Sequence, residues 1–263
     1  MLTPRRLIAL IPAIPFGAIL AAVLRAAHRK DLPSFPNQDA SATFGDPSLP
    51  RLRIVCVGDS SLSGPGLRDI DSIFVRRIAR RYADRHHVEV ISLAVGGSKA
   101  TDVIEGQLAF AVELEPDLAV VSVGSNDAIR GVSTGRYRER LDRIIGDLAP
   151  AAGAVVVVGM GDFGSIPRLP AILRPYLRRR STRFNETAAA AAAAHPRAIK
   201  VYTRGRMTSA FYEDTAMFAG DQFHAGDTGH GVFAESSESA FDAALAMVEA
   251  ARDRSRMSGA AAD

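Results

Sequence analysis

The chain has 263 residues, 47% of them apolar and 23% charged, which fits one sizeable globular core and argues against a disordered chain. Its single cysteine, Cys56, excludes an intrachain disulfide framework and a metal site built from cysteines. The net charge is +3, but residues 1–30 carry five basic residues and no acid. The rest of the chain is therefore slightly acidic, and its composition does not indicate nucleic-acid binding.

An uncharged stretch, LIALIPAIPFGAILAAVL, occupies residues 7–24. Its 18 residues, as a helix, are just long enough to cross the hydrocarbon core of a bilayer. We expect residues 1–30 to anchor the chain in the cell membrane, with the remaining residues forming an extracytoplasmic domain. A cleaved signal peptide, which would give a secreted protein, and an N-terminal helix of a soluble protein are the alternatives. The sequence LAAVLRAAHRKD, at residues 20–31, has charged residues where a signal peptide would have small residues before its cleavage site.

Residues 31–50 contain four prolines and no periodic apolar pattern, so we predict a linker or an irregular wrap. A regular pattern begins at residue 51 and continues to residue 254, which we take as one domain. Residues 255–263 are expected to form a flexible tail.

Within 51–254, short apolar runs alternate with amphipathic segments. We predict strands at 53–57, 88–95, 117–124, 154–160 and 198–203, and helices at 69–86, 100–114, 135–150, 186–195 and 230–254. Nearly continuous apolar strands indicate parallel strands covered on both faces. The predicted fold is a three-layer α/β/α domain with a doubly wound, five-stranded parallel sheet.

Ligands of such sheets bind beyond the carboxyl ends of the strands. The loops at that edge contain GDSSLSG after the first strand, GGSKAT after the second, GSND after the third and DQFHAGDTGH after the fifth. Together they supply serines, a glycine pair, an asparagine and an Asp-His pair. Ester hydrolysis needs this set: a nucleophile, a base, a carboxylate that orients the base, and donors for the oxyanion.

These loops resemble, in order, the four sequence blocks of the SGNH, or GDSL-type, hydrolase family. The matching segments are GDS at 58–60, SLAVGGS at 92–98, GSND at 124–127 and DQFH at 221–224. The resemblance covers about residues 51–250 and implies a flavodoxin-like SGNH hydrolase fold. Each block alone occurs often by chance, whereas four in sequence, each after its own strand, are specific. The sequence departs from the family pattern at Ser61, Ser92, Ala94 and Ala225, none of which is a catalytic position.

The resemblance implies a serine esterase that uses no metal and no cofactor. Ser60 would be the nucleophile, His224 the base and Asp221 the residue that orients His224. The amides of Ser60 and Gly97 and the side chain of Asn126 would bind the oxyanion. The expected substrate is a lipid ester, an acylated sugar or a small acyl ester.

Two alternative functions share this set of residues. An acyltransferase of the cell envelope would pass the acyl group to an alcohol instead of water, and a catalytically silent protein would only bind a ligand on the same fold.

Three other residues are weaker candidates for catalytic roles. Ser133 lies in GVSTG, which fits the G-x-S-x-G pattern, but no strand runs directly into it. His230, at a helix start, is expected to cap or to be exposed, and Asp59 to shape the turn before Ser60.

Overall fold

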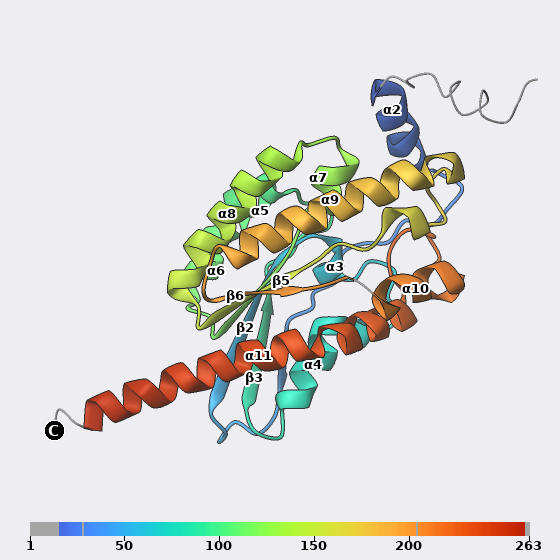
Figure 1. The fold of residues 1–263 in the computed structure, drawn as a ribbon. Helices are drawn as coiled ribbons and strands as arrows, with labels where there is room; N and C mark the ends of the chain where they lie inside the picture. The colour runs from blue at the N-terminus through green and yellow to red at the C-terminus, as the bar shows by residue number, and fades with distance from the viewer. Residues whose placement is uncertain (1–15, 28, 204, 261–263) are drawn as a thin grey trace, which may run out of the picture.

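A six-stranded β-sheet lies between two layers of helices in the computed structural model of the chain, which describes residues 16–27, 29–203 and 205–260 (Figure 1). The strands are ordered β1-β3-β2-β4-β5-β6. Their bounds are Ala42–Phe44 (β1), Arg51–Gly58 (β2), His87–Ser92 (β3), Leu118–Ser122 (β4), Ala154–Val158 (β5) and Ala198–Val201 (β6). Strands β2 to β6 pair in parallel, which confirms the predicted doubly wound sheet.

Helices α5, α6, α8 and α9 cover one face of the sheet, and α4 and α11 cover the other (Figure 1). The helices are α2 (Phe16–Ala27), α3 (Ser60–Ser63), α4 (Phe74–Tyr82), α5 (Ala100–Gly106), α6 (Leu108–Glu113), α7 (Ser125–Ile129), α8 (Thr134–Ala151), α9 (Arg174–Ala193), α10 (Arg206–Glu213) and α11 (Asp227–Ala260). Short 3-10 turns occur at Ile70–Ser72 (η2), Phe163–Ser165 (η3), Ala171–Leu173 (η4) and Thr215–Met217 (η5).

The core is built on both faces of the central strands. Every residue of β4 and β5 is buried, because both faces of these strands are covered by helices. Successive side chains of a strand point to opposite faces. Val55 and Val57 accordingly belong to the core cluster on the face covered by α5, α6, α8 and α9, whereas Ile54 and Cys56 belong to the cluster on the face covered by α4 and α11. Cys56 has no exposed surface, as its place in a predicted core strand indicates.

The segment 31–50, predicted as a linker or irregular wrap, contains strand β1 and packs on the domain. β1 pairs antiparallel with β3, with Ala42 opposite Val90. The side chain of Asn37 accepts hydrogen bonds from the hydroxyl of Ser63 and the amide of Gly96. Three residues are too few for a detectable alternation of apolar and polar side chains, which is why the sequence did not indicate this strand.

Helix boundaries differ from the predicted ones in two informative places. The predicted helix 100–114 is interrupted at Gln107, which separates α5 from α6. Helix α11 continues to Ala260, past residue 254, so most of the predicted flexible tail is helical.

The N-terminal apolar stretch is only partly described. Helix α2 has 12 residues, and its residues Val23 and Ala26 are buried in the same core cluster as α8 and α9. In the part of the chain that the structure describes, no helix is both long and apolar enough to cross a membrane. Residues 1–15 lie outside that part, and the membrane anchor predicted for 1–30 stays a prediction.

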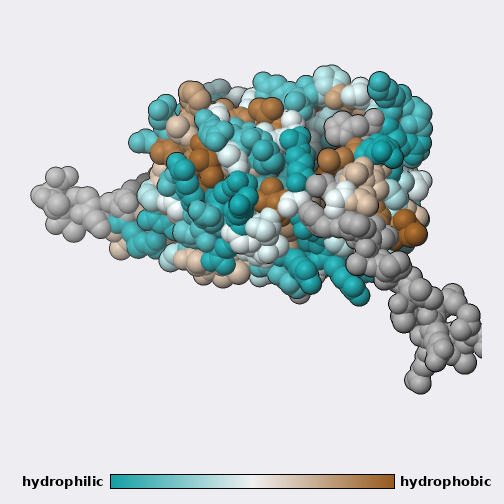
Figure 2. All heavy atoms as spheres, turned by 90° about the horizontal axis from the view of Figure 1, so that it is seen from above, coloured by the Kyte–Doolittle hydropathy of each residue, from teal (hydrophilic) through white to brown (hydrophobic). Residues whose placement is uncertain are grey.

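The surface in Figure 2 is mostly hydrophilic, with small, separate apolar patches. Large exposed apolar side chains come from different elements, for example Phe110 of α6 and Ile172 of η4. Apolar residues scattered singly in this way are normal on protein surfaces.

Replacing Gly58 is expected to destabilise the fold. Gly58 lies opposite Ser122 in the sheet with φ +151°, and an added Cβ would lie 1.9 Å from the carbonyl oxygen of Ser122. We expect Gly58→Ala to lower the free energy of unfolding by about 3 kcal/mol or more, measured by urea denaturation. The control is Gly106→Ala, whose Cβ would meet no atom within 4 Å. Equal stability of the two variants would contradict this packing.

Candidate active site

The turn that carries Ser60 is fixed by the end of β2. The amide of Asp59 donates to the carbonyl of Ser122 over 2.9 Å, which holds the turn to the neighbouring strand β4. Asp59 is the N-cap of the short helix α3, and its carboxylate accepts from the amide of Ser61. Ser60 therefore lies two residues beyond the strand and begins the helix.

Two backbone amides near this turn are unused. Among the described residues, neither the N–H of Ser60 nor that of Gly97 donates to a protein acceptor. Gly97 has φ +87°, and a Cβ there would have only the Arg130 guanidinium within reach, at 4.0 Å. Gly97 thus combines a conformation that favours glycine with open space beside its backbone.

Asn126 lies in α7, directly after β4. Its Nδ2 donates to the carbonyl of Ser98 over 3.1 Å, so this side chain is tied to the loop that contains Gly97. One Nδ2 hydrogen is used in this bond, and the amide group carries a second one. The fixed amide can therefore still donate to a bound group.

Asp221 and His224 form a tight pair in the loop before α11. Asp221 Oδ2 lies 2.6 Å from His224 Nδ1, and Asp221 Oδ1 accepts from the amides of Phe223 and His224. Burial raises the pKa of Asp221, but the hydrogen bond from His224 and the two amides outweigh it, so the net pKa lies below the ordinary value. An ionised Asp221 holds the Nδ1–H tautomer and leaves His224 Nε2 free to accept a proton.

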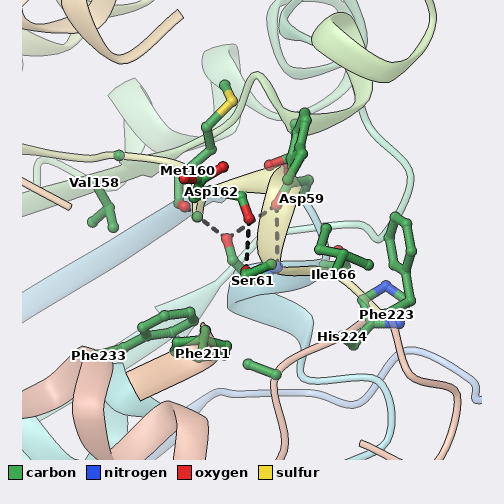
Figure 3. Close-up of a pocket in the computed structure, with 18 of the residues that line it drawn as sticks. Asp59, Ser61, Val158, Met160, Asp162, Ile166, Phe211, Phe223, His224 and Phe233 are labelled. Atoms are coloured by element: carbon green, nitrogen blue, oxygen red, sulfur yellow. Dashed lines mark hydrogen bonds between the residues drawn. The ribbon is translucent and has the colours of Figure 1, made fainter. Parts of the chain in front are cut away.

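Ser60 and His224 line the same cavity, which has a volume of about 120 Å³. Figure 3 shows Phe211 and Phe233 at one end of it and Phe223 with His224 at the other. Most of the lining is apolar or aromatic, including Val158, Met160, Phe163, Ile166, Met207, Phe211, Phe218, Phe223 and Phe233. Gly97 and Asn126 are not among the lining residues, although Ser125 is. The cavity can take an apolar group next to Ser60.

Asp59 is buried, with 2% of its surface exposed, and has an unusual electrostatic state. Burial raises its pKa to about 6, against the smaller opposing effect of its hydrogen bonds with Ser61. Its Oδ1 accepts from the Ser61 hydroxyl, while its buried Oδ2 has no hydrogen-bond partner among the described residues. The expected role of Asp59 in shaping the turn agrees with these contacts.

Two buried residues hold the loops of the site, and the sequence pattern did not indicate their roles. Buried Gln107 accepts from the amide of Gly58 over 2.8 Å and donates to its carbonyl over 3.1 Å, so it fixes the end of β2. Buried Asp127 accepts from the amide of Ala100 over 2.8 Å and connects the loops after β3 and β4. A glutamine within an apolar helical pattern was the one available signal for Gln107.

The competing residues have structural roles. Ser133 is the N-cap of α8, where its hydroxyl accepts from the amide of Arg136. His230 is buried, not exposed as expected, and stacks on Phe74, whose amide donates to its Nδ1. Burial, and secondarily the nearby charge of Arg77, lower the pKa of His230 to about 3, so this ring stays neutral.

Within the described residues, no three His, Cys, Asp or Glu side chains gather where a metal ion could bind.

Residues 56–232 match the model of the GDSL-like lipase/acylhydrolase family. No match was found among curated proteins.

Several solved structures have a similar fold. An acetylxylan esterase from Geobacillus stearothermophilus is 14% identical, with 75% of this chain and 95% of that chain covered and a TM-score of 0.57. TesA is 22% identical over 70% of this chain and 95% of its own, with a TM-score of 0.57. The psychrotrophic esterase EstA from Pseudoalteromonas sp., inhibited by monoethylphosphonate, is 14% identical over 73% and 98%, with a TM-score of 0.56.

The buried Asp59 is expected to make stability depend on pH. Because its pKa of about 6 lies above the ordinary value near 3.8, its contribution to stability is complete below about pH 4 and is lost as the pH rises through 6. Relative to Asp59→Asn, the wild type should lose roughly 3 kcal/mol of unfolding free energy between pH 4 and 7, measured by urea denaturation. If the unfolding free energies of wild type and Asp59→Asn differ by the same amount at pH 4 and pH 7, the raised pKa of Asp59 is contradicted.

Proposed function

Since this chain belongs to the GDSL-like lipase/acylhydrolase family and is a carboxylic ester hydrolase, we propose that it acts as a serine esterase with Ser60 as the nucleophile. His224 is the base and Asp221 orients it. The observation that carries this assignment is the 2.6 Å contact of Asp221 with His224 Nδ1, beside a cavity that Ser60 and His224 both line. These contacts support a base with a fixed tautomer at the same cavity as the Ser60 hydroxyl.

The reaction proceeds in two steps. The Ser60 Oγ attacks the ester carbonyl carbon while His224 Nε2 takes the hydroxyl proton, and the carbonyl π electrons move to oxygen. The tetrahedral intermediate collapses, and His224 returns the proton to the departing alcohol, leaving an acyl-enzyme on Ser60. His224 then takes a proton from water as the water oxygen attacks the acyl carbon. The bond from the acyl carbon to Ser60 Oγ breaks, His224 returns the proton to Oγ, and the carboxylic acid leaves.

The oxyanion is bound by donors that are fixed before the substrate arrives. The amides of Ser60 and Gly97 are free to donate within the described structure, and the side chain of Asn126 is held by the carbonyl of Ser98. Each comes from a different loop at the carboxyl edge of the sheet. Donors aimed in advance at the developing charge stabilise the transition state without reorganisation.

The cavity supports an ester with an apolar group. Aromatic side chains line the space beside Ser60. They come from α10 (Phe211), from α11 (Phe233), from the loop after β5 (Phe163) and from the loop before α11 (Phe223). Transfer of an apolar substrate group into such a space is favourable in proportion to the area it buries. We propose that this group belongs to the ester substrate.

A fluorophosphonate probe tests the nucleophile directly. We expect the wild type to be labelled, Ser60→Ala to be unlabelled, and the neighbouring Ser61→Ala to be labelled like the wild type. Ser61 is a matched control because its hydroxyl bonds Asp59 and Ser122 and needs no catalytic role. An unlabelled wild type would contradict the esterase proposal, and labelling of Ser60→Ala would place the nucleophile elsewhere.

Removing the charge of Asp221 tests its orienting role. Asp221→Asn is expected to lower kcat roughly 10³- to 10⁴-fold, because the amide no longer enforces the required tautomer of His224. The control Asp214→Asn, at an exposed carboxylate, should stay within about twofold of wild type. Hydrolysis of p-nitrophenyl butyrate measures both, and similar kcat values for the two variants would refute the role of Asp221.

A further inference from the structure

One arginine joins three segments that are far apart in the sequence. Arg168 lies between η3 and η4, in the loop that follows β5. Its guanidinium donates to backbone carbonyls at the end of α2, and both its amide and its guanidinium donate to the loop of Asp221 and His224. The mechanism above makes no use of these contacts.

The guanidinium bonds the last turn of α2 and the chain just beyond it. Arg168 Nε donates to the carbonyl of Ala26 over 3.0 Å, and its Nη2 donates to the carbonyl of Arg29 over 2.9 Å. The last carbonyls of a helix lack intrahelical partners and carry partial negative charge. The planar guanidinium bonds one such carbonyl, that of Ala26, together with the carbonyl of Arg29 just beyond the helix end.

The contacts with the catalytic loop fix its backbone. The amide of Arg168 donates to the carbonyl of Gln222 over 3.1 Å, and Nη1 lies 3.4 Å from the carbonyl of Asp221. Gln222 has φ +58°, a left-handed conformation that is costly for a residue with a side chain. Such a conformation persists where the surroundings hold it. Here the amide of Arg168 bonds the Gln222 carbonyl, and the guanidinium adds a contact with the carbonyl of the neighbouring Asp221.

The position of α2 is set by its own apolar face. Val23 and Ala26 are 3% and 9% exposed and belong to the core cluster that includes Ile129 of α7 and Leu177 of α9. Figure 1 shows α2 next to the N-terminal end of α9, at the edge of the helical layer. If α2 leaves this place, the guanidinium loses two of its three carbonyl acceptors.

We propose that Arg168 is a positioning residue that makes the geometry of the Asp221–His224 pair depend on the docking of α2. The N-terminal helix thereby controls turnover at a site to which it contributes no catalytic group. Undocking of α2 leaves the guanidinium free to move, and the Asp221 carbonyl next to the strained Gln222 loses its contact with Nη1. The proposal rests on the proposed triad.

The test compares full-length variants in the hydrolysis of p-nitrophenyl butyrate. Arg168→Met removes all guanidinium contacts and Arg168→Lys keeps the charge. Val23→Asp places a charge in the buried face of α2 and favours its release. Arg179→Met and Ala21→Asp are matched controls, because both residues are exposed, one on α9 and one on α2. Circular dichroism and thermal unfolding establish that each variant is folded.

We expect Arg168→Met and Val23→Asp each to lower kcat roughly tenfold or more, since small displacements of a catalytic group are costly. KM should stay within about threefold, because the substrate cavity is not altered. Arg168→Lys should recover part of kcat, and both controls should match the wild type. The double variant Val23→Asp/Arg168→Met should be no slower than the slower single variant, because both changes break one connection.

Three results would overturn the proposal. The first is a folded Arg168→Met variant whose kcat is within twofold of wild type. The second is a double variant whose loss of kcat equals the product of the losses of Val23→Asp and Arg168→Met. In both cases the triad stands if Ser60→Ala remains inactive. The third is a Ser60→Ala variant with wild-type activity, which removes the triad itself and the Arg168 proposal with it.

Discussion

The close approach of β2 to β4 at Gly58 is the constraint on which the site depends. Only a residue without a side chain allows the backbone of Gly58 to lie against the carbonyl of Ser122, and the next amide, that of Asp59, then bonds that carbonyl. Ser60 is thereby placed at the carboxyl edge of the sheet. Gln107 holds the same peptide from the side of the helices, so the turn is fixed from two directions.

Around this turn, each functional loop is tied to another one. Asn126 bonds the carbonyl of Ser98, Asp127 bonds the amide of Ala100, and Arg168 bonds the loop of Asp221. These contacts join loops that follow different strands and therefore depend on the whole sheet. The unused donors at Ser60 and Gly97 are left in a rigid setting, which is the condition for electrostatic stabilisation of an oxyanion.

The sequence predicted those features that arise locally or repeat. Apolar strands alternating with helices gave the parallel sheet, and the short blocks around Ser60, Asn126 and His224 gave the candidate site. Features made by contacts across the fold were not predictable in this way. Strand β1 has three residues and exists because β3 offers it an edge, and the roles of Gln107 and Arg168 arise from backbone partners distant in the sequence.

The central claim is that the acyl group is carried by Ser60, and peptide mass spectrometry of enzyme quenched during turnover of an ester tests it most directly. Trypsin releases residues 54–68, which contain Ser60, Ser61 and Ser63 in a single peptide. The account predicts that this peptide gains the mass of one acyl group and that fragmentation places the group on Ser60. An acyl group on Ser61, on Ser63 or on another peptide would contradict it.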